Sequence, residues 1–225
     1  MSDNIKVGRS DPQPPDSGGS SREEILSRLR KNTHETYDMP RLDTLKPITY
    51  AAPLAEFIKK TTTTAGAKLI EKKKEESLND IIQAIAQSLI AGGGADNAPI
   101  IASNLPGIEA QLNPDTVDTA QELMKVDLGV IEGKIGVAEN GCIWIPQQMK
   151  EKAVCFASEQ LVVVLSREAI VSNMHEAYAR IDRSTEYFSQ YKFGTFISGP
   201  SKTADIESAL VYGAQAARAL TVVLV

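Results

Sequence analysis

Three short apolar runs limit the folds that this chain can adopt. They are Cys142–Ile145, Ala153–Ala157 and Leu161–Leu165, and only turn-length gaps separate them. Continuous apolar runs of this length are typical of strands that are buried on both faces, because a solvent-facing side would show alternating polar residues. We therefore predict that all three are central strands of a sheet with helices packed against both faces.

Helical patterns alternate with further apolar runs along the rest of the chain. The clearest pattern runs from Leu78 to Leu89 at helical spacing, with Ser77 or Asn79 as its cap and the glycines at 92–94 as its stop. Other predicted helices cover 21–32, 53–64, 115–124 and 170–181, and other predicted strands cover 67–71, 99–102, 126–130, 195–197 and the last residues. This alternation predicts an α/β fold with an open, mostly parallel sheet, in which ligands bind beyond the carboxyl ends of the strands.

The chain is long enough for one α/β domain with a sizeable core. It has 225 residues, of which 42% are hydrophobic. Residues 1–20 are rich in Asp, Pro, Gly and Ser, so they cannot offset the entropy of ordering and are expected to form a disordered tail. We expect a single domain over 21–225, in which 21–47 form a helix followed by an irregular arm.

Charge and cysteine content exclude several classes of partner. The net charge of −5 offers no field that attracts a phosphate backbone, so we expect no nucleic-acid partner. The run Leu161–Leu165 is far too short to span a bilayer, and residues 1–20 lack the apolar centre of a signal peptide. We expect a cytoplasmic protein without membrane insertion. Cys142 and Cys155 cannot supply four thiolates, so we expect no metal or cofactor on this chain.

One candidate site is the loop that begins Gly199–Pro200–Ser201–Lys202–Thr203. We expect this turn to start a short helix, whose unpaired N-terminal amides would attract an anion. The two hydroxyls and the lysine would suit a phosphate or a carboxylate, and we include Asp205 and Glu207 of the expected first turn in the site. The alternative is that the hydroxyls only cap the helix, and that the two acidic side chains interact with the positive end of its dipole.

The second candidate segment is Glu139–Asn140–Gly141, which follows small residues just before an apolar run. The Glu139 carboxylate could act as nucleophile or general base, and Asn140 could orient a carbonyl group. The alternative is that Glu139 only forms structural hydrogen bonds. We expect Trp144 to lie in the core and His175 to be a surface or packing residue. If both segments come together, they would frame one polar pocket.

Three stretches of the sequence resemble one known family. They are S-R-E-E-I-L-S-R-L at 21–29, G-V-A-E-N-G-C-I-W at 136–144 and G-P-S-K-T-A-D-I-E at 199–207. The chain resembles the LUD-domain family, of the small lactate-utilization protein C type, over nearly everything after residue 20. The resemblance implies the α/β fold shared with CoA transferases, ribose-5-phosphate isomerase and glucosamine-6-phosphate deaminase. Many members have a threonine where this chain has Asn140, while Glu139 is kept.

The resemblance also implies a role in the oxidation of L-lactate to pyruvate together with iron-sulfur partner proteins. We expect an accessory subunit whose partners hold the iron-sulfur clusters, and which binds a small anionic metabolite between 139–141 and 199–203. One alternative is a free-standing enzyme that acts on a carboxylate, an acyl-CoA or a sugar phosphate, with Glu139 as base or nucleophile. Another alternative is a structural scaffold in which the motif residues only cap helices and form turns.

Overall fold

The computed structural model describes residues 21–32, 46–91, 98–183, 193–205 and 209–225. The chain divides into two units, Met1–Leu45 and Lys46–Val225. Within the first unit the described residues form helix α1 (Ser21–Asn32), with acidic residues in its first turn and basic residues in its last. This confirms the predicted helix at 21–32. The expected disordered tail at 1–20 lies outside the described residues, and the expected domain from 21 to 225 stays a prediction.

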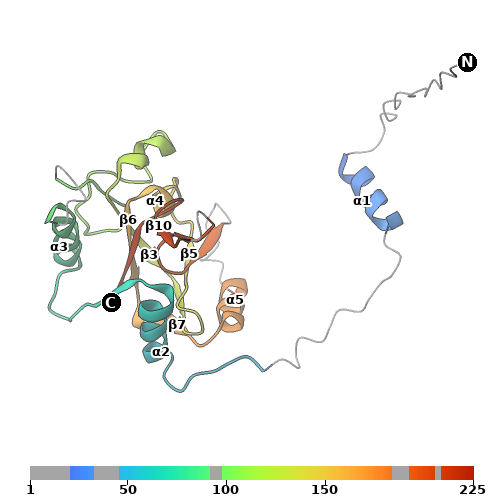
Figure 1. Cartoon of the computed structure of the whole chain (residues 1–225), viewed down its shortest axis with the longest axis horizontal. Helices are drawn as coiled ribbons and strands as arrows, with labels where there is room; N and C mark the ends of the chain where they lie inside the picture. The colour runs from blue at the N-terminus through green and yellow to red at the C-terminus, as the bar shows by residue number, and fades with distance from the viewer. Residues whose placement is uncertain (1–20, 33–45, 92–97, 184–192, 206–208) are drawn as a thin grey trace, which may run out of the picture. The chain divides into compact units, whose positions relative to one another are not determined.

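A five-stranded parallel sheet forms the centre of the second unit (Figure 1). Its order is β1 (Lys68–Glu71), β11 (Ala219–Leu224), β6 (Gln160–Leu165), β3 (Leu128–Gly133) and β2 (Ile101–Ser103), and every neighbouring pair is parallel. The predicted strands at 67–71, 99–102, 126–130 and 161–165, and the final strand, all belong to this sheet. The prediction of an α/β fold with a mostly parallel sheet is confirmed.

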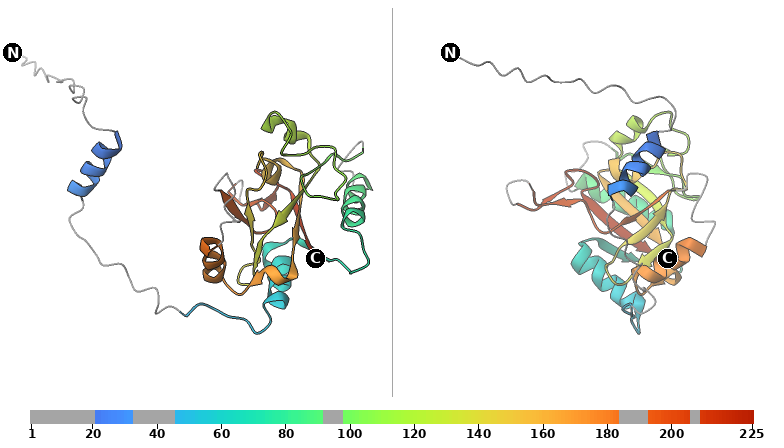
Figure 2. Two further views of the ribbon diagram at one scale, coloured as in Figure 1. Left: turned by 180° about the vertical axis from the view of Figure 1, so that it is seen from behind. Right: turned by 90° about the vertical axis from the view of Figure 1, so that its right-hand side faces the viewer.

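A second, four-stranded sheet packs against one face of the first. Its order is β7 (Ile170–Val171), β4 (Ile135–Val137), β5 (Ile143–Pro146) and β8 (Gly194–Ile197). Strand β5 is antiparallel to both of its neighbours, and β4 is parallel to β7. Two further strands of two residues each, β9 (Lys202–Thr203) and β10 (Val211–Tyr212), pair in antiparallel fashion. They extend away from the two sheets (Figure 2).

Helices cover the faces that the sheets leave open. Helix α2 (Pro53–Lys60) continues into a π-helical turn, η2 (Thr61–Ala65). It lies against β7, and its Phe57 side chain belongs to the largest core cluster. Helix α3 (Leu78–Ala91) packs on the other face of the first sheet, and α5 (Met174–Arg183) packs on the second sheet. Shorter helical segments are η3 (Ala120–Lys125), α4 (Val154–Ala157) and η4 (Arg167–Ala169). Among these helices, α3 and α5 therefore lie on opposite sides of the unit (Figure 1).

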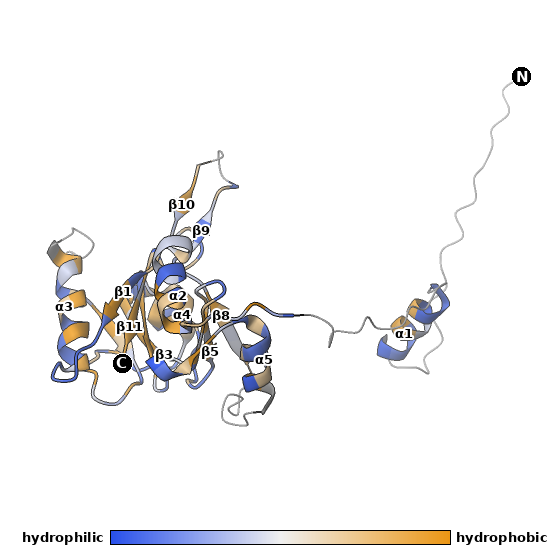
Figure 3. Ribbon diagram, turned by 90° about the horizontal axis from the view of Figure 1, so that it is seen from below, coloured by the Kyte–Doolittle hydropathy of each residue, from blue (hydrophilic) through white to orange (hydrophobic). Residues whose placement is uncertain are grey.

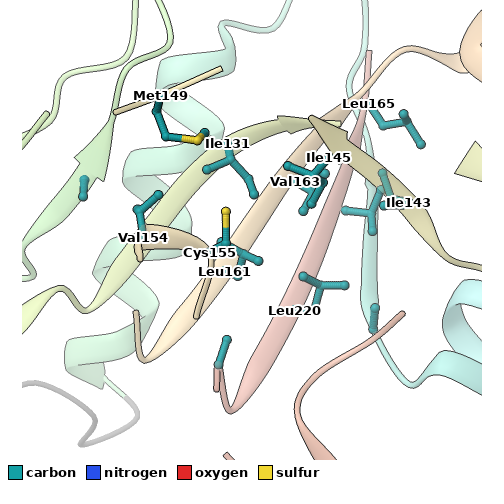
Figure 4. Close-up of a cluster of buried hydrophobic side chains, with 14 of the residues drawn as sticks. Ile131, Ile143, Ile145, Met149, Val154, Cys155, Leu161, Val163, Leu165 and Leu220 are labelled. Atoms are coloured by element: carbon teal, nitrogen blue, oxygen red, sulfur yellow. The ribbon is translucent and has the colours of Figure 1, made fainter. Parts of the chain in front are cut away.

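The largest core cluster lies between the two sheets. It contains Ile143 and Ile145 from β5 together with Leu161, Val163 and Leu165 from β6, as Figure 4 shows. These apolar runs are buried because each faces a sheet or helix on both sides, as the sequence pattern predicts. No helix in the described part of the chain is long and apolar enough to cross a bilayer.

The structure corrects three predicted elements. The run 153–157 forms helix α4, in which the Ser158 hydroxyl donates to the Val154 carbonyl at 2.8 Å, and is not a strand. Short apolar runs do not distinguish a buried strand from a buried helical turn, which is why this prediction failed. Ile170 belongs to strand β7 rather than to the following helix, and the helix predicted at 115–124 is reduced to η3.

Candidate functional site

The two predicted site segments meet at one edge of the four-stranded sheet. Strands β4 and β8 run in the same direction, because both are antiparallel to β5. The residues that follow them therefore leave the sheet at the same edge. The Ser198 hydroxyl donates to the Asn140 carbonyl at 3.3 Å, which joins the segment after β8 to the segment after β4.

The π-helical turn η2 lies against both segments. A Cβ atom on Gly141 would lie 2.8 Å from the Thr61 nitrogen, and one on Gly199 would lie 1.9 Å from the Ala65 carbonyl oxygen. Both glycines also have φ near +70°, a conformation that side-chain-bearing residues rarely adopt. Glycine is thus required at both positions by close approach to the same turn. Single π-helical turns are frequent at functional sites.

The backbone of the 199–203 loop does not form the helix N-terminus that the sequence predicts. The Ser201 N–H donates to the Ala217 carbonyl at 2.9 Å, and Lys202 and Thr203 pair with β10 as strand β9. The tertiary partners Ala217 and β10 supply hydrogen bonds that a local helix would otherwise provide. The predicted helix N-terminus is therefore wrong at residues 201–203, and anion binding by this loop stays a prediction. Asp205 is exposed, and Glu207 lies outside the described residues.

Lys202 connects this loop to η2. Its Nζ donates to the Ala65 carbonyl at 2.5 Å, across a long stretch of sequence. Because Ala65 is the last residue of η2, this charge stabilises a carbonyl at a helical C-terminus. The predicted cation is thus present at the site, where it is held by a backbone carbonyl.

A groove of about 430 Å³ borders the loop from Ser198 to Lys202. Cys155, Leu161 and Leu220 form buried apolar parts of its lining, and hydroxyls and the Lys202 side chain form polar parts. Burial raises the pKa of the Cys155 thiol to about 12, so this sulfur is neutral at physiological pH and acts as part of the apolar floor. An apolar floor with one cationic edge suits a small organic anion.

Glu139 faces a different element. Its Oε2 accepts a hydrogen bond from the Met174 N–H at 3.0 Å, and its own N–H donates to the Ser172 carbonyl. The carboxylate therefore satisfies the first backbone donor of α5 and lies at the positive end of that helix. This contact matches the structural alternative for Glu139, and its catalytic role stays a prediction. The Asn140 side-chain oxygen accepts from the Cys142 N–H at 3.1 Å and closes a local turn.

Some contacts of the candidate site come from residues outside the two segments, and the sequence did not predict them. Ala65 of η2 and Ala217 accept hydrogen bonds from the 199–203 loop, and Thr61 lies against Gly141. Nothing in the T-T-T-T-A-G pattern indicates a π-helical turn. Trp144 packs against Phe196 with ring centroids 4.9 Å apart, and His175 is exposed, as predicted. Within the described residues, no three His, Cys, Asp or Glu side chains gather in a way that could hold a metal ion.

Thr61 is fully buried, and its hydroxyl has no hydrogen-bond partner in the described parts of the chain. An unsatisfied buried hydroxyl destabilises a fold by about 1–3 kcal/mol. Thr61→Val keeps the shape and removes the polar atom, so it should raise the free energy of unfolding by about 1 kcal/mol in urea titrations. The exposed Thr64→Val is the control and should change this value by less than about 0.5 kcal/mol. Destabilisation by Thr61→Val would mean that the hydroxyl has a partner.

Comparisons with known proteins give a family model, a curated relative and a structure of similar fold. The family model described as the LUD domain matches residues 54–225. "Lactate utilization protein C" of Shouchella clausii (strain KSM-K16) is 27% identical over 109 residues, which cover 48% of this chain and 48% of that protein. The chain thus matches about half the length of this curated relative. A crystal structure of a DUF162 family protein from Deinococcus radiodurans aligns with a TM-score of 0.54 and 16% identity, over 79% of this chain and 99% of that one. This likeness supports the fold.

Proposed function

The chain belongs to the LUD domain family, whose model matches residues 54–225, and on this premise we propose that it serves lactate utilization as a carboxylate-binding subunit. The name of the curated relative, a lactate utilization protein, supports this setting. In the proposed system, which operates in the cytoplasm, L-lactate is oxidised to pyruvate and iron-sulfur partner subunits carry the electrons. This chain has two cysteines, too few for a four-thiolate cluster, so we assign it no electron transfer.

The groove beside the Ser198–Lys202 loop is the observation that carries this proposal. Lactate and pyruvate are small monocarboxylates, so each would need one cation and a small apolar surface. The groove offers Lys202 at its edge and the Cys155, Leu161 and Leu220 side chains at its floor. A carboxylate that accepts from the Lys202 ammonium would form a charge-assisted hydrogen bond, which is stronger than a neutral one.

Lys202 has a second role in this proposal because it also holds the Ala65 carbonyl. An ammonium group has three donors, so one can remain on the carbonyl while another reaches a ligand. The ligand would then be positioned against the rigid turn η2 rather than against a freely moving side chain. The role of Lys202 is to bind and orient a carboxylate, and no covalent step is assigned to it.

Ligand binding can be measured directly on the full chain. Thermal unfolding with L-lactate or with pyruvate should show stabilisation that reaches about 2.7 kcal/mol at a ligand concentration of about 100 dissociation constants. Lys202→Met keeps the apolar stem and removes the charge, so it should weaken binding at least tenfold. Lys74→Met removes an exposed charge elsewhere and is the matched control. If neither compound stabilises the wild-type chain, the carboxylate site is wrong.

Growth of the source cells on L-lactate tests the biological role separately. Deletion of the gene should abolish growth on L-lactate as sole carbon source. The wild-type gene and the Lys74→Met variant should restore growth, whereas the Lys202→Met variant should not. Glu139→Gln, at equal protein level, keeps a hydrogen-bond acceptor for Met174 and should restore growth. Failure of Glu139→Gln would instead favour an enzyme with a Glu139 base. Normal growth of a deletion strain that has no other lactate dehydrogenase would contradict the role in lactate utilization.

A further inference from the structure

On the α3 face of the parallel sheet, the edge strand β1 is less well covered than the other strands. Five strands at a spacing of about 4.8 Å span roughly 19 Å, whereas a helix with its side chains is about 10–12 Å wide. On this face the described residues provide one helix, α3, together with Leu105, Ile108 and Ala110 of the following loop. Helix α3 lies next to β1 and β11 (Figure 3). Val130, Val162 and Val223 are buried on this face, whereas Lys68 of β1 is exposed and Ile70 is half-buried, so the open area lies at the β1 edge. Parallel sheets normally have both faces buried, so this edge could receive a ligand.

A cavity of about 590 Å³ lies between α3 and this part of the sheet. Its volume is within the range of pockets for small molecules. One end is apolar, with Ile70 from β1 and Ile81 and Ile85 from α3. The other end is polar, with side chains from the amino-terminal halves of β1, β6 and β11 and from the last turns of α3: Lys68, Gln160, Thr221 and Ser88.

Thr221 gives the second observation that points to a ligand. It is 4% exposed, and no hydrogen bond of its hydroxyl occurs within the described residues. Along β11, Leu220 and Val222 belong to the core between the two sheets, while Val223 belongs to the α3 side. Because side chains alternate along a strand, Thr221 faces α3, and it lines the cavity. The Thr221 oxygen is not among the fully buried unpartnered atoms of the described residues, so it is open to the cavity and can donate to a ligand there.

The charged side chains at the polar end indicate whether a ligand there would be an anion or a cation. A smaller cavity of about 280 Å³ shares Lys68, Ser88 and Gln160 and adds Asp127, Glu159 and Arg218. Arg218 is paired with Glu159 at 3.0 Å, and Asp127 accepts from the Ile100 N–H at 2.7 Å. Lys68 has no ion-pair partner among the described residues. The charges of the smaller cavity balance, because Asp127 stays anionic, but among the described residues that line the larger cavity Lys68 alone is charged. The charge that borders the larger cavity is therefore positive.

We propose that this cavity binds a medium-chain carboxylate. Its acyl chain lies against Ile70, Ile81 and Ile85, and its carboxylate accepts from the Lys68 ammonium and the Thr221 hydroxyl. The helix segment from Ile81 to Ser88 that lines the cavity is about 10 Å long, which accommodates a medium-length chain. This site is separate from the groove at Lys202 and does not depend on a role in lactate utilization.

Titration calorimetry of the full chain with octanoate tests the site, with n-octanol as the uncharged probe of similar length. The wild type should bind octanoate. Lys68→Met should weaken octanoate binding at least tenfold and leave n-octanol binding within about twofold. Ala84→Trp places a large side chain into the cavity and should abolish binding of both probes. Gln87→Trp, on an exposed position of α3 that does not line the cavity, is the matched control and should bind like the wild type.

Three outcomes would overturn the proposal. The first is that the wild type binds neither probe. The second is that octanoate binding survives Ala84→Trp, which would place the ligand elsewhere. The third is that the chain dimerises in sedimentation experiments and Ala84→Trp alone disrupts the dimer, in which case a second copy covers the cavity. Octanoate binding that Lys202→Met leaves unchanged would support the separation from the groove.

Discussion

A Gly199→Ala chain is expected to lose at least about 3 kcal/mol of its free energy of unfolding. Two effects add at this position. The φ angle of +71° disfavours any residue with a side chain, and the new Cβ would lie 1.9 Å from the Ala65 carbonyl oxygen, well inside contact distance. The obstacle is backbone, so it cannot move aside as a flexible side chain does. Relief requires the loop to separate from η2.

Urea unfolding of Gly199→Ala and Gly107→Ala would separate these two effects. Gly107 has a similar φ of +80°, but its Cβ would have nothing within 4 Å. Gly107→Ala should therefore show the conformational cost alone, about 1 kcal/mol. Equal losses in the two variants would show that the approach between Gly199 and Ala65 is not tight in solution. A folded Gly199→Ala chain should also lose binding at the Lys202 groove, because the loop carries that side chain.

The Leu123→Ala substitution should destabilise the chain by about 3 kcal/mol. Leu123 lies in η3, is 0% exposed and belongs to the cluster between the two sheets, so truncation leaves a cavity. The next residue, Met124, is 70% exposed in the same short helix, which makes Met124→Ala a control with the same backbone environment. That substitution should change the free energy of unfolding by less than about 0.5 kcal/mol.

Both values come from the midpoints of urea titrations followed by circular dichroism, provided that the slopes stay equal among the variants. Similar losses for Leu123→Ala and Met124→Ala would mean that η3 contributes through its backbone rather than through the Leu123 side chain. In that case the Thr119–Glu122 capping box, which satisfies the first donors of η3, would be the next feature to remove.

Most of the parallel sheet could be predicted from the sequence, because its strands consist mainly of short apolar runs between helical patterns. The run at 161–165 and the apolar stripe from Leu78 to Leu89 each fit one kind of element, and both formed it. The run at 153–157 fits a buried strand and a buried helical turn equally well. It forms the helical turn, in which the Ser158 hydroxyl donates to the Val154 carbonyl. Strand β4 was not predicted, because it lies in a glycine-rich segment that resembles a turn. Its one glycine, Gly136, is in fact packed closely against Leu165 and Phe57.

The candidate site was harder to predict because its geometry depends on distant residues. The motifs at 136–144 and 199–207 identified the family, and the family is confirmed. Their local structure was misjudged at Lys202, since strand β10 and Ala217 compete with a local helix and lie later in the chain. The preference for small residues at Gly141 and Gly199 was visible, but the partner that requires it, the turn η2, was not.

The position of β11 has a consequence for the order of folding. Strand β1 pairs with β11 through Lys68 and Thr221, and β6 pairs with the opposite side of β11. During synthesis, β1 therefore remains without its sheet partner until residues 219–224 have emerged, and β6 has an open side for the same period. Such long-range pairing makes folding slow and leaves apolar strand edges exposed to other chains. Nascent chains of this protein should thus associate with one another more readily before β11 is inserted between β1 and β6 than afterwards.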